Sequence, residues 1–71
     1  MLYRVYVLHE LNRVEVFASN SFSRAREAYL SALSSKSLKV NFDRALMTCA
    51  GRIINRHRLS DHIPPSDIRS N

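Results

Sequence analysis

An amphipathic helix over 21–35 is the feature that most constrains how this 71-residue chain can fold. Apolar residues recur there at spacings of three and four, which places them along one side of a helix, and polar residues fill the other side. Ser21 or Ser23 suits the N-cap position, because a hydroxyl there accepts a free backbone N–H, and no Gly or Pro interrupts the segment. The apolar side consists of Phe22, Ala25, Tyr29, Ala32 and Leu33, and its alanines favour close packing on a flat sheet.

Two segments before this helix alternate in the manner of β-strands. Tyr3, Val5 and Val7 point one way within 2–9, and Val14, Val16 and Ala18 recur at every second position within 13–18. These segments predict an antiparallel β-hairpin whose valines pack beneath the helix. The outer face then carries more apolar bulk than a solvated surface needs, since it consists of Arg4, Tyr6, Leu8, Arg13, Glu15 and Phe17.

The segments after the helix predict a short strand and a second helix. Residues 38–42 alternate between apolar and polar side chains, which indicates a third strand. Over 43–58 the apolar residues gather on one side of a helical wheel and Arg44, Arg52 and Arg56 on the other, which predicts a basic helix.

The alternative for 43–58 is a β-hairpin that turns at Ala50-Gly51. Glycine inside a helix costs about 1 kcal/mol relative to alanine, which favours the hairpin. However, each of the two candidate strands contains two adjacent apolar residues, Leu46-Met47 and Ile53-Ile54, and this fits strand alternation poorly. The helix is therefore the preferred prediction.

The composition predicts a single α+β domain over 1–60 and a mobile tail over 61–71. A hydrophobic content of 45% is typical of a folded chain. Beyond Ser60 the sequence is polar, and Pro64-Pro65 excludes further helix. A chain this short buries only roughly 60% of its unfolded surface on folding, so binding to a partner or forming a dimer would add stability.

The N-terminus and the cysteine content favour a cytoplasmic protein. One cysteine cannot form an intramolecular disulfide, whereas small secreted domains usually contain several. Arg4 interrupts the apolar start, which lacks a small-residue cleavage site typical of signal peptides. No apolar run approaches the length of a membrane span, so no membrane association is expected.

All of the excess positive charge lies between residues 36 and 59. The net charge is +5, and this segment has six basic residues against one acid, Asp43, while the rest of the chain balances. Because surface charges are usually mixed in sign, we expect this segment to bind an acidic partner. The candidate partner-binding residues are Lys36, Lys39, Arg44, Arg52, Arg56 and Arg58.

The outer face of the predicted hairpin is a second candidate interface. Aromatic residues among arginines on an open sheet are typical of modules that stack single-stranded bases, although the aromatic-glycine consensus of ribonucleoprotein motifs is absent. A dimer interface or a docking face for another protein fits the same residues. This secondary interface consists of Arg4, Tyr6, Leu8 and Phe17.

No motif predicts catalysis, a cofactor or a metal site. Cys49 and His57 would lie two turns apart on the predicted helix, too far to share a zinc ion. Ser60, Asp61 and His62 are consecutive, whereas catalytic triads assemble from residues distant in sequence. We therefore expect a protein that is not an enzyme and that holds no metal or cofactor.

The strand, strand and Ser-capped helix pattern of 3–7, 14–18 and 21–29 resembles the opening of small accessory proteins of phages and other mobile elements. These include anti-CRISPR inhibitors and other host-takeover proteins. The resemblance covers about the first half of the chain and transfers no functional residue. It implies stoichiometric binding that blocks a partner without turnover, in the host cytoplasm if the chain is phage-encoded.

The leading hypothesis is thus a non-enzymatic inhibitor or regulator of a nucleic-acid-associated machine. Its expected partner is an acidic protein surface or a nucleoprotein complex. One alternative is a transcriptional regulator that binds DNA or RNA directly, and another is a structural subunit that self-associates, as a homodimer for example.

Overall fold

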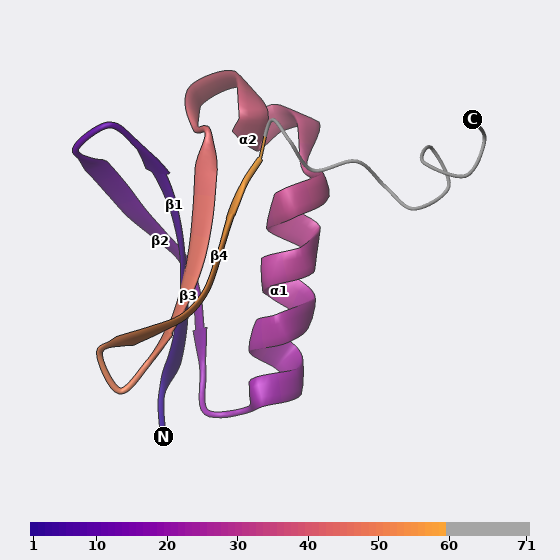
Figure 1. The fold of residues 1–71 in the computed structure, drawn as a ribbon. Coiled ribbons are helices and arrows are strands. Elements are labelled where there is room, and N and C mark those ends of the chain that lie inside the picture. Colours follow the sequence, from indigo (N-terminus) through magenta and orange to yellow (C-terminus); the bar gives the residue numbers. More distant parts are fainter. Residues whose placement is uncertain (60–71) are drawn as a thin grey trace.

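The computed structural model describes residues 1–59 and has an α+β fold in two layers (Figure 1). One layer is a four-stranded antiparallel sheet with strand order β2-β1-β3-β4. The longer helix packs against one face of this sheet, so the α+β class and the packing of the N-terminal hairpin against that helix are confirmed. The elements are β1 (Tyr3–His9), β2 (Asn12–Ser19), α1 (Phe22–Ser34), α2 (Lys36–Asn41), β3 (Arg44–Cys49) and β4 (Arg52–Arg58).

The helix predicted over 21–35 is confirmed as α1. Ser21 is the N-cap, and its hydroxyl oxygen accepts the backbone N–H of Arg24 at 3.3 Å. This bond satisfies one of the N–H groups that a helix leaves free at its start. The side chains that α1 buries against the sheet are Ala25, Tyr29, Ala32 and Leu33.

A β-bulge in β2 changes which side chains of the hairpin face α1. Val5 pairs with Phe17, but Tyr6 pairs with Glu15, so Val16 is an extra residue without a partner in the register. Phe17 therefore lies on the same side of the sheet as Val5 and packs against the core. The prediction that Phe17 belongs to the outer face is wrong, because uninterrupted alternation does not allow for a bulge.

The strand predicted over 38–42 is wrong, because these residues belong to α2 and to the residue that caps it. The hydroxyl oxygen of Ser35 accepts the backbone N–H of Leu38 at 3.2 Å and so starts a short helix. Leu38 and Phe42 are four residues apart and both pack against the core, whereas Val40 is 79% exposed. A strand would have placed all three on one face, while a helix separates Val40 from the other two.

The helix predicted over 43–58 is also wrong, and the alternative hairpin is the observed structure. β3 and β4 pair in antiparallel fashion and turn at Ala50 and Gly51, whose φ angles are 53° and 80°. Two positive φ angles in a two-residue turn are the pattern of a type I′ turn, whose twist matches that of the flanking strands.

The position of β3 in the sheet explains why Leu46 and Met47 are adjacent apolar residues within a strand. β3 lies between β1 and β4. One of its faces packs against α1, and side chains of the two neighbouring strands shield residues on the other face. Ala45 and Met47 face α1 and are fully buried, while Leu46 and Thr48 on the other face are only 8% and 7% exposed. A central strand of this kind does not show the alternation that an edge strand shows.

A second β-bulge, in β4, explains the adjacent apolar residues Ile53 and Ile54. Thr48 pairs with Ile53 and Met47 pairs with Asn55, which leaves Ile54 as the extra residue. The bulge thus places two consecutive isoleucines in a strand without requiring a helix.

The core lies between α1 and the central strands. Leu59, which follows β4, is fully buried, and its backbone N–H donates to the carbonyl oxygen of Asp43 at 2.7 Å. This bond fixes the end of β4 beside the start of β3. The buried members of the core are Val5, Val7, Ala25, Tyr29, Ala32, Leu33, Ala45, Met47 and Leu59.

Neither α1 nor α2 is both long and apolar enough to cross a membrane. The predicted tail, 61–71, which includes Asp61 and His62, lies outside the described residues, as does Ser60.

Candidate functional site

The face of the sheet opposite α1 is covered by no helix or strand among residues 1–59, and we call it the open face (Figure 1). Side chains alternate between the two faces of a strand, so the pairing register decides which residues share it. Three rows of open-face residues run from β2 to β4: Arg13, Leu8, Arg44 and Arg58; Glu15, Tyr6, Leu46 and Arg56; and Ala18, Arg4, Thr48 and Ile53.

The β2 side of the open face contains an ion pair and a cation–π contact. Nη1 of Arg4 donates to Oε1 of Glu15 at 3.0 Å. The hydrogen bond and the negative charge of Glu15 raise the pKa of Arg4, which stays protonated. The guanidinium carbon of Arg13 lies 4.6 Å from the ring centroid of Tyr6, so a cation already occupies one side of this ring.

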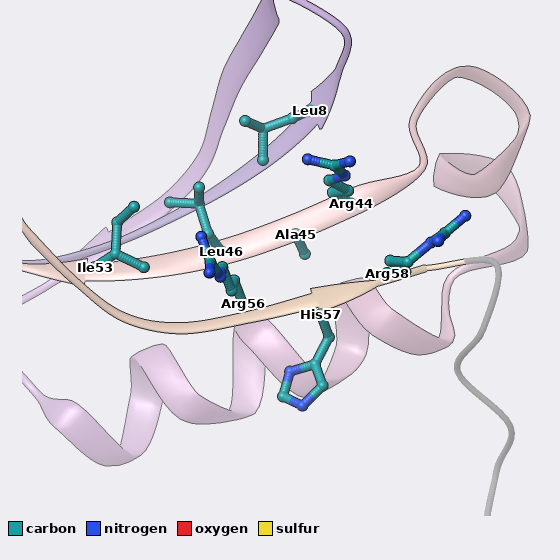
Figure 2. Close-up of a pocket in the computed structure, with 8 residues that line it drawn as sticks. All are labelled: Leu8, Arg44, Ala45, Leu46, Ile53, Arg56, His57 and Arg58. Atoms are coloured by element: carbon teal, nitrogen blue, oxygen red, sulfur yellow. The ribbon is translucent and has the colours of Figure 1, made fainter.

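The β3–β4 side of the open face contains a hollow of about 430 Å³ (Figure 2). Two of its lining residues, Ala45 and His57, point their side chains toward α1 in Figure 2, away from Leu8. The lining residues whose side chains belong to the open face are Leu8, Arg44, Leu46, Ile53, Arg56 and Arg58.

The hollow has an aliphatic floor and basic edges. Leu46 is 8% exposed and lies between Tyr6 and Arg56 in the register, whereas Ile53 is 55% exposed. Arg44 and Arg56 are exposed, and neither has a carboxylate partner within residues 1–59. A ligand in this hollow would therefore meet apolar surface below and guanidinium groups beside it.

The charge of the open face is strongly asymmetric. Its register positions include five arginines but one carboxylate, Glu15, which is paired with Arg4. Such a surface attracts anions over the distance of a Debye length, about 8 to 10 Å at moderate salt, and repels cations.

The structure gathers half of the predicted partner-binding residues on this face. Arg44, Arg56 and Arg58 lie together, as the lining of the hollow shows. Arg52 does not join them, because it pairs with Cys49 on the α1 side of the sheet, and its predicted grouping with Arg44 and Arg56 is wrong. A helix would have placed Arg44, Arg52 and Arg56 on one side, whereas the bulge in β4 puts Arg52 on the opposite face of the sheet from the other two.

Lys36 and Lys39 are exposed on α2, which packs on the α1 side of the sheet through Leu38. These lysines are therefore not part of the open face. Their role in binding stays a prediction.

The secondary interface predicted on the N-terminal hairpin lies on the open face through Arg4, Tyr6 and Leu8. Because β1 pairs with β3, this interface forms one continuous surface with Arg44, Arg56 and Arg58. The sequence suggested two separate surfaces, since a helix over 43–58 would not have joined the sheet. The contribution of Leu46 and Ile53 was missed for the same reason, and the signal that predicts it is the Ala50-Gly51 turn.

Tyr29 and Cys49, on the other side of the sheet, have side-chain partners. The hydroxyl of Tyr29 lies 2.7 Å from Nδ1 of His57, and burial raises the pKa of Tyr29 to about 12. Sγ of Cys49 lies 3.4 Å from Sδ of Met1. Within residues 1–59, no three or more His, Cys, Asp or Glu side chains are grouped closely enough to hold a metal ion.

Comparison of the chain with protein-family models, with curated proteins and with solved structures found no match.

Proposed function

We propose that this chain is a non-enzymatic binding protein that docks an anionic partner on the open face and thereby inhibits or regulates a nucleic-acid-associated machine. The observation that carries this proposal is the set of five arginines on one uncovered sheet face with a single carboxylate among them. Sheet faces without a covering layer usually carry mixed charges, and this one does not.

The placement of the arginines on strands favours binding over a merely solvated surface. β1 and β3 are central strands, so Arg4 and Arg44 are attached to the most constrained part of the sheet. A guanidinium group is weakly hydrated and presents a planar set of donors that matches carboxylate and phosphate oxygens. Positioning such groups in advance lowers the entropy that binding must overcome.

Self-association through the open face is disfavoured by the same charges. A symmetric dimer would bring a face with five arginines against its own copy. Like charges opposed across an interface weaken it, so a partner of opposite charge fits this surface better than a second copy does.

Charge reversal on the open face tests the proposal. Arg44→Glu combined with Arg56→Glu should weaken binding of fluorescein-labelled polyglutamate by about tenfold or more at low salt, since each reversal replaces attraction with repulsion. Fluorescence anisotropy measures the affinity, and circular dichroism checks that both exposed substitutions leave the fold intact.

The matched control reverses two exposed arginines away from the open face. Arg24→Glu combined with Arg52→Glu changes the net charge by the same amount but alters α1 and the α1 side of β4. This control should bind polyglutamate nearly as well as the original protein. Equal weakening by the two double variants would mean that net charge alone drives binding, and the proposed surface would have no special role.

A further inference from the structure

The hollow on the open face differs from a simple basic patch because its floor is aliphatic. Leu8, Leu46 and Ile53 come from three neighbouring strands, and Ile53 is 55% exposed. Phosphate or carboxylate contacts alone need no apolar floor. The floor therefore indicates a partner that brings an apolar group together with its negative charge.

The aromatic content of the open face argues against nucleic-acid bases as that apolar group. Bases stack on exposed aromatic rings. Tyr6 is the one aromatic side chain at the paired open-face positions of β1 to β4, and Arg13 lies over its ring. Tyr3 and Phe17 are on the α1 side, where Tyr3 contacts the ring of Phe22. An aliphatic floor without a free stacking ring suits an aliphatic side chain better than a base.

We infer that the hollow binds an acidic protein segment whose single apolar side chain contacts Leu46 and Ile53 while flanking carboxylates pair with Arg44 and Arg56. This inference rests on the proposed function and names the chemistry of the partner. Arg44 and Arg56 both neighbour Leu46 on the open face, Arg44 two residues earlier on β3 and Arg56 as its partner on β4. A segment with one apolar side chain and a carboxylate for each of these two guanidinium groups would match this arrangement.

The charges and the volume of the hollow favour such a segment over a larger apolar partner. The hollow measures about 430 Å³, within the range of about 300 to 1,000 Å³ that is typical of ligand pockets. The arginines around it would oppose a wholly apolar surface, because burying unpaired charges is unfavourable. One apolar anchor surrounded by acids satisfies both parts of the site.

Synthetic probes of equal charge test the inference. The first probe is a peptide with one leucine flanked on each side by glutamates, and the second replaces this leucine by glycine. A third probe is single-stranded oligothymidylate of the same net charge. The leucine peptide should bind about tenfold more tightly than the glycine peptide, because partial burial of a leucine side chain is worth about that factor.

Two neighbouring isoleucines supply matched variants of the protein. Ile53→Ser removes apolar surface from the hollow, whereas Ile54→Ser alters the adjacent bulge residue, which does not line it. Both side chains are about half exposed, at 55% and 43%, so both variants should keep the fold. Ile53→Ser should abolish most of the preference for leucine over glycine, and Ile54→Ser should preserve it.

The outcomes separate this inference from the proposed function. Equal binding of the two peptides, with weakening by Arg44→Glu/Arg56→Glu, would overturn the anchor and leave the anionic docking surface standing. Tighter binding of oligothymidylate than of either peptide would overturn the protein partner in favour of nucleic acid. Absence of binding by all three probes at low salt would overturn the proposed function itself.

Discussion

The turn between β3 and β4 contains a residue that is poorly suited to its backbone conformation. Ala50 has a φ of 53°, a left-handed conformation that costs an L-residue about 1 to 2 kcal/mol. Asparagine tolerates this conformation and is the preferred first residue of a type I′ turn before glycine. Ala50→Asn should raise the free energy of unfolding by about 0.5 to 1 kcal/mol, measured by urea denaturation.

Gly51→Ala is the opposite test of the same turn. A Cβ at Gly51 would meet nothing within 4 Å, so any loss of stability would come from the φ of 80° and not from a clash. The expected loss is about 1 to 2 kcal/mol. A stable Gly51→Ala variant together with a destabilised Ala50→Asn variant would contradict the turn geometry.

Tyr29 contributes stability that depends on pH. Burial raises its pKa from 10.0 to about 12, so the folded state holds the hydroxyl proton more tightly than the unfolded state does. The contribution is therefore complete below pH 10 and is lost as the pH rises from 10 to about 12. Tyr29→Phe also removes the 2.7 Å contact with His57 and should cost about 0.5 to 1.5 kcal/mol at neutral pH.

Urea denaturation at pH 8 and pH 11 checks both parts of this prediction. The variant should lose less stability between the two pH values than the original protein loses. The stability of the Tyr29→Phe variant will still depend on pH to some extent, because burial also raises the pKa of Tyr3. An identical loss in the two proteins would contradict the assigned role of Tyr29.

Among the helices and strands, the sequence correctly predicts those whose signals lie within their own residues. α1 was found because its apolar spacing and its serine cap are contained within its own residues. The hairpin of β3 and β4 was not the preferred prediction because the burial of β3 depends on its pairing with β1, which is more than thirty residues earlier in the chain. The bulge at Ile54 then imitated a helical pattern by placing two isoleucines together.

The close approach of α1 to the sheet depends on its alanines. Ala25 is fully buried against the sheet, so no space is left for a larger side chain. Ala25→Leu should lower the free energy of unfolding by about 1 to 3 kcal/mol, because overpacking displaces the helix. Ser31→Leu, on the exposed side of α1, is the control and should change stability little. A stable Ala25→Leu variant would mean that α1 packs less tightly than described.

For the molecule as a whole, the helix predicted over 43–58 omitted the pairing of β3 with β1. The open face was therefore predicted as two separate surfaces. Charge, which is visible in the sequence, predicts Arg44, Arg56 and Arg58 as candidate binding residues. Their position beside Tyr6 and Leu8 was not predictable without the β1–β3 pairing. Charge therefore identified the residues, and topology decided which of them act together.

A nuclear magnetic resonance titration of the ¹⁵N-labelled protein with polyglutamate tests the central claim that these residues form one docking surface. The amide signals of Tyr6, Leu46 and Arg56 should shift together, since they form one row across β1, β3 and β4. Those of Arg24 and Arg52 should remain in place. Shifts confined to Arg52, Lys36 and Lys39, with Tyr6 and Leu46 unchanged, would contradict the docking surface proposed for the open face.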